Sequence, residues 1–299
     1  MKVGIIGLGR MGSGIAQRLL EAGHEVIGYD PGAQAVNGAQ QLGVTTVPTL
    51  ADLARETRII WLMVPVGTPV DATINSLLPY LQSGDIVVDG GNSKFTDSIA
   101  RANMLAHHGV SFLDCGTSGG VHGRELGFCL MVGGDELIYK KIQPLLVAIA
   151  APNAVSHVGP SGAGHYVKMV HNGIEYGLMQ AYAEGFELLK EGTFKDHKLD
   201  LHEISRVWNQ GSIIRSWLLE LTHTILRKDQ ELNAISGEIE EGGTGLWTAQ
   251  DARACQVPMP VLDASLEVRR WSRKTGGNFA TKLIAMMRHA FGGHAVKKV

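Results

Sequence analysis

The sequence predicts two domains: an α/β domain with a mainly parallel sheet, followed by an all-α domain. The chain has 299 residues, which is enough to bury two separate cores. Short apolar runs alternate with amphipathic stretches as far as about residue 158, whereas helical patterns dominate beyond residue 164. We therefore predict that residues 1–160 form the first domain and residues 161–299 the second.

The first domain shows the alternation that is typical of βαβ units, in which a helix connects two parallel strands. The predicted strands are Val3–Leu8, Glu25–Tyr29, Arg58–Val64, Asp85–Asp89, Val110–Cys115 and Phe128–Val132. The predicted helices between them are Ser13–Glu21, Pro69–Leu81 and Ser93–His107. In the second domain the predicted helices are His165–Glu191, Leu201–Gln210, Ile214–Leu226 and Val261–Arg273.

Charge and composition exclude several classes of function. The formal net charge is −2 and no basic block exceeds a few residues, so we expect neither a nucleic-acid partner nor a membrane surface. The N-terminus lacks the apolar core of a signal peptide, and we expect a cytoplasmic protein. The three cysteines, Cys115, Cys129 and Cys255, are far apart and lack metal-ligand spacing, so we expect buried free thiols and no metal cofactor.

A glycine motif follows the first predicted strand and opens the first predicted helix. Gly7 would form the tight turn, Gly9 would let the backbone approach a pyrophosphate, and Gly12 would allow close helix–sheet packing. The helix N-terminus adds free N–H groups and the positive end of its dipole. We therefore predict a Rossmann-type dinucleotide site rather than a plain glycine-rich turn, with the contacting residues Gly7, Leu8, Gly9, Arg10, Met11 and Gly12.

An aspartate at the end of the second predicted strand bears on the choice of cofactor. The Asp30 carboxylate can accept hydrogen bonds from the adenosine ribose hydroxyls and would repel a 2′-phosphate. The residues after it, Pro31 and Gly32, are uncharged. We therefore expect NAD rather than NADP, with Arg10 as the nearest basic residue that could favour NADP.

Polar and turn residues follow three later strands. We expect Val64 and Pro65 to contact the cofactor. Asn92, in the run Asp89–Ser93, is the polar group expected where cofactor and substrate meet, although an ordinary turn residue is equally compatible with its position. The next turn is predicted to bind a carboxylate through backbone N–H groups and a hydroxyl, with a flexible loop as the alternative; its residues are Ser118, Gly119 and Gly120.

The segment that opens the helical domain carries four polar residues at i, i+3, i+4 and i+7: Lys168, His171, Asn172 and Glu175. At about 100° per residue they fall within an arc of roughly 100° on one helix face. A lysine and a glutamate two turns apart can exchange protons with the two ends of a small substrate. A solvated charged face is the alternative, but apolar residues surround the stripe. We expect this face to line a cleft between the domains, a usual place for small-molecule sites.

Taken together, these motifs resemble those of the β-hydroxyacid dehydrogenase superfamily. The glycine motif, Asn92, the turn at residues 118–120, and the pairing of Lys168 with Asn172 carry this resemblance. Within the superfamily, the run His165–Gln180 (HYVKMVHNGIEYGLMQ) is similar to the 6-phosphogluconate dehydrogenase family, as are Gly243–Thr248 and Arg288–His294. The commonest form of that family carries a second, duplicated helical unit. This chain therefore resembles the short branch, which often prefers NAD.

The resemblance implies oxidative decarboxylation of 6-phospho-D-gluconate to ribulose 5-phosphate and CO2, without a metal. Lys168 would take the proton of the C3 hydroxyl and then polarise the keto oxygen, because a desolvated lysine can be neutral when needed. Glu175 would protonate C1 of the enediol. Asn172 would orient the hydroxyl, and His171 would bind the substrate. Asn92, Ser118, Gly119 and Gly120 would also contact the substrate.

The resemblance also implies a phosphate site. Its candidate residues are Tyr176, Thr244 and Arg269, with Arg288 and His294 expected from a neighbouring subunit. An exposed basic helix face is the alternative interpretation of Arg269. The family usually has a lysine two residues before the threonine of the Gly-Thr-Gly-x-Trp motif, where this chain has Gly242, so one phosphate contact is missing or supplied elsewhere.

Two other functions remain open at this point. The first is a non-decarboxylating, NAD-dependent β-hydroxyacid dehydrogenase acting on a small unphosphorylated acid, which needs Lys168 and Asn172 but not Glu175. The second is a dinucleotide sensor, which predicts loss of the polar stripe and an added partner domain. The stripe and the functional-looking C-terminal motif favour the decarboxylating enzyme. We expect a homodimer or homotetramer.

Overall fold

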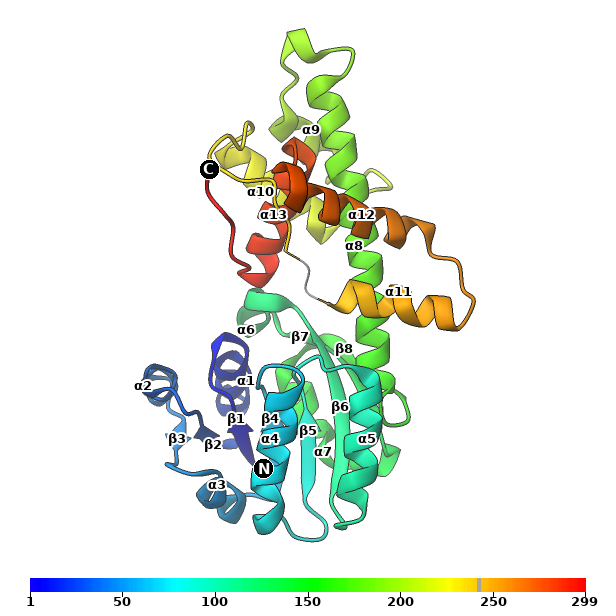
Figure 1. Ribbon diagram of the computed structural model, residues 1–299. Helices are drawn as coiled ribbons and strands as arrows, with labels where there is room; N and C mark the ends of the chain where they lie inside the picture. Colours follow the sequence, from blue (N-terminus) through cyan, green and yellow to red (C-terminus); the bar gives the residue numbers. More distant parts are fainter. Residues whose placement is uncertain (241–242) are drawn as a thin grey trace. The chain divides into compact units, whose positions relative to one another are not determined.

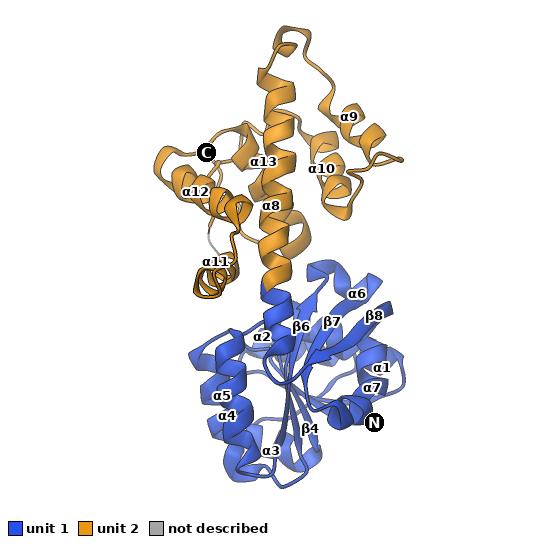
Figure 2. Ribbon diagram, turned by 90° about the vertical axis from the view of Figure 1, so that its right-hand side faces the viewer, with its two compact units in different colours: residues 1–169 blue, residues 170–299 orange. Residues whose placement is uncertain are grey.

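The computed structural model describes residues 1–240 and 243–299. The chain divides into two compact units, residues 1–169 and residues 170–299 (Figures 1 and 2). Unit 1 contains the sheet and its helices, and unit 2 is built from helices. The predicted order, an α/β part followed by a helical part, is confirmed.

Unit 1 is built on an eight-stranded sheet with the order β3-β2-β1-β4-β5-β6-β7-β8. All neighbouring strands are parallel except β6 and β7, which confirms the prediction of a mainly parallel sheet. The first six strands have the arrangement of dinucleotide-binding folds. The strands are β1 Lys2–Ile6, β2 Glu25–Tyr29, β3 Thr45–Thr46, β4 Ile59–Leu62, β5 Ile86–Asp89, β6 Ser111–Ser118, β7 Phe128–Gly134 and β8 Ala150–Gly159.

Helices cover both faces of this sheet. One face packs against α1 (Arg10–Glu21), α2 (Ala33–Gln41) and α7 (Glu136–Ile149). The other packs against α3 (Leu50–Glu56), α4 (Thr68–Leu77) and α5 (Phe95–Ala106). Successive side chains of a strand point to opposite faces, so Ile60 of β4 joins one core and Trp61 the other. Burial on both faces explains why β4 is a continuous apolar run. The shorter elements of this unit are η1 Leu78–Tyr80, η2 Gly120–His122 and α6 Gly123–Leu126.

Unit 2 is organised around α8 (Ala163–Glu191), a helix of 29 residues whose first turns belong to unit 1. Figure 2 shows the other helices of the unit grouped around it. Their common core includes Phe186 of α8, Leu219 of α10 and Leu283 of α13, all fully buried. These helices are α9 Leu201–Trp208, α10 Trp217–Lys228, α11 Thr244–Ala254, α12 Pro260–Thr275 and α13 Phe279–Gly292, with a short η3 at Lys195–His197.

Local capping sets where several helices begin. The Ser216 hydroxyl accepts a hydrogen bond from the backbone N–H of Leu219, so α10 begins at Trp217. The start predicted from the sequence, Ile214, is three residues too early. Asn278 and Thr281 form a capping box at the start of α13. In unit 1, Asn92 has a positive φ of 56° and the Ser93 hydroxyl bonds to Asp89, so α5 begins only at Phe95.

Among the described residues, the prediction missed two strands, β3 and β8, and six α-helices, α2, α3, α6, α7, α11 and α13. Strand β8 is the last strand of the sheet, and it contains Pro152 and Asn153, the latter with a positive φ of 60°. Proline cannot donate to a strand ladder and is confined to edges and irregular positions, so the sequence of β8 lacks the usual strand pattern.

The expectation of buried thiols is correct for one cysteine and wrong for two. Cys115 is buried in the sheet, whereas Cys129 and Cys255 are exposed. Cys129 lies in β7 but its side chain faces away from the core. Among the described residues, none of the helices combines the length and apolar character that crossing a membrane requires.

Candidate functional site

The glycine motif forms a tight turn between β1 and α1. Gly7 has a φ of 94°, and a side chain there would overlap the carbonyl of Met63 on the neighbouring strand end. A side chain at Gly12 would overlap the carbonyl oxygen of Gly7. Gly9, by contrast, has open space where a Cβ would lie. The turn is therefore crowded on the protein side and open on the side where a pyrophosphate would approach.

Asp30 is fixed by the backbone of two turns. One carboxylate oxygen accepts the N–H of Leu8 at 2.8 Å, and the other accepts the N–H of Gly32 at 2.7 Å. Two donors hold the carboxylate in one orientation, at the end of β2 next to the glycine turn. A negative charge is thus presented, already oriented, at the position where the ribose of a bound dinucleotide would lie.

A cavity of about 750 Å³ opens at the carboxyl ends of β1, β2, β4 and β5. Its walls include seven residues that the sequence predicted for the cofactor: Gly7, Gly9, Met11, Asp30, Val64, Pro65 and Asn92. Leu8 and Gly12 are buried and are not part of the lining. Arg10 is exposed at the first position of α1 and is not part of the lining. The position of the cavity, outside the carboxyl ends of parallel strands, is where such folds bind ligands.

One wall of this cavity was not predicted. It comes from α4, which contributes Pro69, Ala72, Thr73 and Ser76. These residues have the spacing i, i+3, i+4 and i+7, so they share one helix face. The sequence did contain a signal for this wall, because a helix face made of small and hydroxyl residues leaves room for a ligand.

Asn92 connects the ends of two neighbouring strands. Its Nδ2 donates to the carbonyl of Thr117 at 2.9 Å, and its Oδ1 accepts the Thr117 N–H at 2.8 Å. The side-chain amide therefore replaces a missing strand partner for β6. Because Ser118 follows directly, Asn92 links this cavity to the turn at residues 118–120. From the sequence alone, a role of Asn92 at the meeting point of cofactor and substrate could not be distinguished from that of an ordinary turn residue.

The loop that carries Asn92 rests on a buried ion pair. Asp89, at the end of β5, accepts hydrogen bonds from the Gly91 N–H and the Ser93 hydroxyl. Arg101 of α5 lies 3.3 Å from Asp89 and 2.7 Å from Asp71, and its side chain is 3% exposed. A charge pair at this depth is stable only with such additional hydrogen bonds. This network fixes the backbone that borders the cavity.

Strand β6, which leads into the turn at residues 118–120, approaches the first turns of α8 closely. Ser118 ends β6, and Gly119 and Gly120 have positive φ values of 122° and 54°. Two residues before Ser118, Gly116 faces Lys168: a Cβ at Gly116 would lie 2.5 Å from the Lys168 Cβ. Lys168 is 7% exposed. Unit 1 thus places the predicted catalytic lysine over the strand that leads to the predicted carboxylate-binding turn.

The other three members of the predicted stripe lie further along α8, in unit 2. The Asn172 amide donates to the Thr244 hydroxyl at 3.2 Å, at the start of α11. His171 lies 3.1 Å from the Asn172 amide oxygen and 3.8 Å from a carboxylate oxygen of Glu175. Glu175 and His171 are partly exposed, at 21% and 41%, so both reach solvent. The helix therefore groups an amide, an imidazole and a carboxylate, as predicted from the spacing.

Two of the candidate phosphate residues, Tyr176 and Arg269, meet in the core of unit 2. Tyr176 and Arg269 are both buried, and the Arg269 guanidinium lies over the tyrosine ring. Arg269 is only 1% exposed, so the alternative of an exposed basic helix face is wrong for this residue. Gly245 leaves room for the ring, because a Cβ there would overlap it. Gly242, where we expect one phosphate contact to be missing or supplied elsewhere, lies outside the described residues.

Arg288 lies in the same chain's α13 and is buried in unit 2. Burial lowers the pKa of its guanidinium, while electrostatic interaction with Tyr176, Glu175 and Glu240 acts in the opposite direction. An arginine remains charged under such conditions. Arg288 is therefore within electrostatic range of Glu175 and Tyr176 of α8. His294 follows α13, is exposed, and packs edge-on against Phe291.

Comparisons with known proteins agree with this arrangement. Residues 2–159 match the model of the NAD binding domain of 6-phosphogluconate dehydrogenase, and residues 164–298 match that of its C-terminal domain. The chain belongs to the 6-phosphogluconate dehydrogenase family. Among the described residues, no group of three or more histidine, cysteine, aspartate or glutamate side chains is placed to hold a metal ion.

Members of the family differ in length and in cofactor. A Haloferax volcanii relative, an NAD(+)-dependent, decarboxylating 6-phosphogluconate dehydrogenase, is 46% identical over 100% of this chain and 99% of its own length. A Bacillus subtilis NADP(+)-dependent, decarboxylating enzyme is 37% identical over 90% of this chain, which spans 60% of that protein. The solved 6-phosphogluconate dehydrogenase of Plasmodium falciparum superposes with a TM-score of 0.84 at 30% identity, covering 91% of this chain and 62% of that one.

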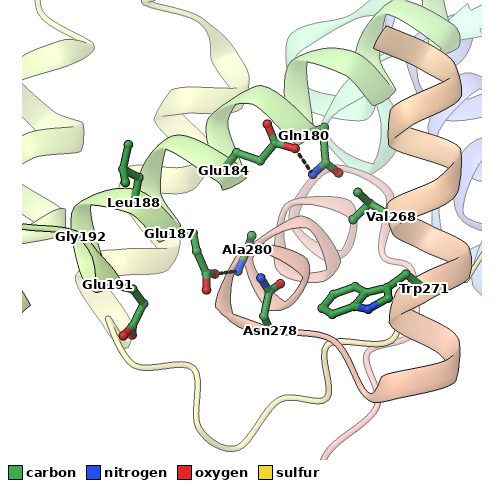
Figure 3. Close-up of a pocket in the computed structure, with 10 residues that line it drawn as sticks. All are labelled: Gln180, Glu184, Glu187, Leu188, Glu191, Gly192, Val268, Trp271, Asn278 and Ala280. Atoms are coloured by element: carbon green, nitrogen blue, oxygen red, sulfur yellow. Dashed lines mark hydrogen bonds between the residues drawn. The ribbon is translucent and has the colours of Figure 1, made fainter. Parts of the chain in front are cut away.

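A second pocket, of about 370 Å³, lies within unit 2 (Figure 3). Three glutamates line it, Glu184, Glu187 and Glu191. Glu187 accepts the Ala280 N–H at the start of α13, and Glu184 accepts the Gln180 amide. The family acts on 6-phosphogluconate, whose phosphate and carboxylate would be repelled by these carboxylates. The pocket is therefore unsuited to the family's substrate.

Proposed function

We propose that this protein catalyses the NAD-dependent oxidative decarboxylation of 6-phospho-D-gluconate to D-ribulose 5-phosphate and CO2. The observation that carries the proposal is that α8, which carries Lys168, also carries Glu175 with His171 beside it and Tyr176 beneath the Arg269 guanidinium. Simple oxidation of a β-hydroxy acid requires a base such as Lys168 but no second proton donor. Decarboxylation adds the need for a second proton donor, which Glu175 can be. Recognition of a phosphate adds the need for a positive charge, which Arg269 can supply.

The dinucleotide would lie in the cavity at the carboxyl ends of the strands. Gly7, Gly9 and the start of α1 would hold its pyrophosphate, and Asp30 its adenosine ribose. Asp30 also supports NAD as the cofactor, because a fixed carboxylate repels a 2′-phosphate. When bound, the cofactor accepts a hydride from C3 of the substrate.

Lys168 acts first as a base. Neutral Lys168 takes the proton of the C3 hydroxyl as the hydride leaves C3, which gives a 3-keto acid and an ammonium group. Burial against Gly116 supports this role, because desolvation disfavours the charged form of a lysine. Asn172 orients the C3 hydroxyl, and Asn92 with the turn at residues 118–120 binds the carboxylate end.

Decarboxylation then uses both ends of the stripe. The C1–C2 bond breaks, CO2 leaves, and its electron pair forms the C2=C3 double bond while the Lys168 ammonium protonates the C3 oxygen. Glu175, in its protonated form, gives a proton to the former C2, which becomes C1 of ribulose 5-phosphate. Lys168 takes back the hydroxyl proton as the C2 ketone of the product forms. His171, beside Glu175, binds the substrate.

The phosphate end of the substrate is assigned to unit 2. Tyr176, Thr244, Arg269, Arg288 and His294 are the candidate ligands, of which we propose that Arg269 and Arg288 supply the positive charge. We also propose that the active form is a homodimer or homotetramer in which the C-terminal segment of one subunit reaches its neighbour's site.

The proposal is tested by comparing substrates in the presence of NAD. We expect 6-phosphogluconate to be turned over with a kcat/KM at least about a hundredfold above that of 3-hydroxyisobutyrate, because only the phosphorylated acid engages both arginines. We expect Glu175→Gln to slow turnover of 6-phosphogluconate by about 10²-fold to 10⁴-fold while NAD binding is kept. A preference for the unphosphorylated acid would favour the non-decarboxylating dehydrogenase.

A further inference from the structure

The start of α8 is fastened to β6 by a carboxylate that the sequence did not suggest. Asp114 lies in β6 and is fully buried. One of its oxygens accepts the N–H of Gly162 at 2.6 Å, and the other accepts the N–H of His165 at 2.8 Å. Both donors belong to the first turn of α8 or precede it directly. They are among the backbone groups that a helix leaves without partners at its N-terminus.

Glycines let the helix come close enough for this contact. A Cβ at Gly133 of β7 would lie 2.6 Å from the Gly164 nitrogen and 2.7 Å from a carboxylate oxygen of Asp114. A Cβ at Gly164 would overlap the backbone carbonyls of Asp114 and Met131. The first turn of α8 therefore sits directly on the backbones of β6 and β7, which no residue with a side chain at these positions would allow.

A side-chain contact from α5 holds the same turn from another direction. The Ser98 hydroxyl lies 2.7 Å from Nδ1 of His165, and both residues are buried. Lys168 follows His165 by three residues and lies over Gly116, two residues after Asp114 in β6. Any sliding or rotation of the first turn along β6 would thus move the Lys168 amine.

We propose that Asp114 is a positioning residue for the reaction, which sets where Lys168 stands relative to the bound substrate. The inference rests on the proposed function, because it assigns Lys168 the role of base. The Asp114 carboxylate ties two backbone N–H groups of α8 to β6, the strand that ends in the turn at residues 118–120. The base and the carboxylate-binding turn are thereby held on one rigid support.

The test compares Asp114→Asn with Asp85→Asn. Asp85 is equally buried, accepts the Gln82 N–H at 2.7 Å and pairs with Arg58 at 2.7 Å. It directly precedes β5, however, so it lies at the amino ends of the strands, whereas the cavity lies at their carboxyl ends. Both substitutions replace a buried carboxylate oxygen with an amide nitrogen. In Asp114→Asn the amide nitrogen faces an N–H and cannot accept its hydrogen bond.

We expect Asp114→Asn to lower kcat by about 10-fold to 100-fold, because a base misplaced by about 1 Å loses that much rate. The KM for NAD should stay within about twofold of the wild type, since the cavity is not touched. With substrate deuterated at C3, the isotope effect on kcat should rise, because hydride transfer becomes rate-limiting. Asp85→Asn should change none of these values. Equal losses in the two variants, or an unchanged isotope effect, would overturn the proposal.

A second measurement needs no substrate. Hydrogen exchange of the amides at residues 162–168 should be faster in Asp114→Asn than in the wild type and in Asp85→Asn. Unchanged exchange would overturn the proposed fastening even if the wild type oxidises 6-phosphogluconate. Conversely, a wild type inactive on 6-phosphogluconate would contradict the proposed function and not the fastening. If Asp114→Asn does not fold, Gly116→Ala tests the placement of the same turn on β6 through a different contact, because its Cβ would overlap the Gly164 carbonyl and the Lys168 Cβ. The same fall in kcat is expected.

Discussion

The guanidinium carbon of Arg269 lies 3.4 Å from the centroid of the Tyr176 ring. Both side chains are buried, so this cation–π contact is made with little competition from water. The next residue, Arg270, instead pairs with Glu267 at the helix surface, where its side chain is 40% exposed. Two adjacent arginines on α12 therefore have different environments, and only the first contacts Tyr176.

This difference predicts the effect of replacing each arginine by lysine. Arg269→Lys should raise the KM for 6-phosphogluconate by about 10-fold to 100-fold, because lysine cannot bind phosphate with a planar fork or stack in the same way. The kcat should change little. Arg270→Lys is the matched control and should leave both constants unchanged. Steady-state kinetics with varied substrate measures them, and an equal effect of the two changes would remove Arg269 from the phosphate site.

Lys168→Met should abolish turnover without removing cofactor binding. Loss of a general base costs about 10²-fold to 10⁴-fold in kcat, and here the same residue also polarises the keto oxygen. The cavity that would hold NAD does not include Lys168, so the dissociation constant for NADH, measured by fluorescence, should stay within about twofold. Lys141→Met replaces an exposed lysine of α7 and serves as the control. Activity near that of the wild type would remove Lys168 from its role.

Asp30→Ala should shift the cofactor preference toward NADP. The change removes the fixed negative charge that repels a 2′-phosphate, and it leaves the N–H groups of Leu8 and Gly32 without their acceptor. We expect the ratio of kcat/KM for NAD to that for NADP to fall at least about tenfold. Glu21→Ala, at the far end of α1, removes an exposed carboxylate and should not change this ratio. The same result for both variants would mean that discrimination lies elsewhere.

The different burial of the three cysteines predicts which of them an alkylating reagent will label in the native protein. Burial raises the pKa of the Cys115 thiol, so the nucleophilic thiolate is scarce at that site. Cys129 and Cys255 are exposed. Iodoacetamide at pH 8 should therefore label these two positions in the native protein and Cys115 only after denaturation, as read by mass spectrometry. Cys115→Ala should show the native pattern under both conditions. Rapid native labelling of Cys115 would contradict the burial of β6.

Most of the fold could be predicted from local patterns, and what was missed depends on tertiary context. The run Ile59–Leu62 is apolar throughout and short, which indicates a strand buried on both faces. Strand β8 lacks such a pattern, because it is an edge strand interrupted by Pro152 and Asn153. Helix α10 was predicted three residues too early, because the apolar Ile214 precedes the true cap, Ser216.

For the site, the spacing of residues along one helix could be predicted from the sequence, whereas contacts between segments far apart in the sequence could not. The i, i+3, i+4, i+7 pattern of Lys168, His171, Asn172 and Glu175 places them on one face of a single helix. The fastening of α8 by Asp114 joins residues 48 and 51 positions apart in the sequence. No periodicity links such positions, so only the packing of α8 on β6 and β7 reveals it.

The most direct measurement of the proposed reaction uses 6-phosphogluconate labelled with carbon-13 at C1, together with NAD and the purified enzyme. Every hydride transferred should be followed by cleavage of the C1–C2 bond, so NADH and labelled CO2 should form in equal amounts. NADH formation without labelled CO2 would contradict the role of Glu175 and leave an alcohol dehydrogenase that does not decarboxylate its substrate.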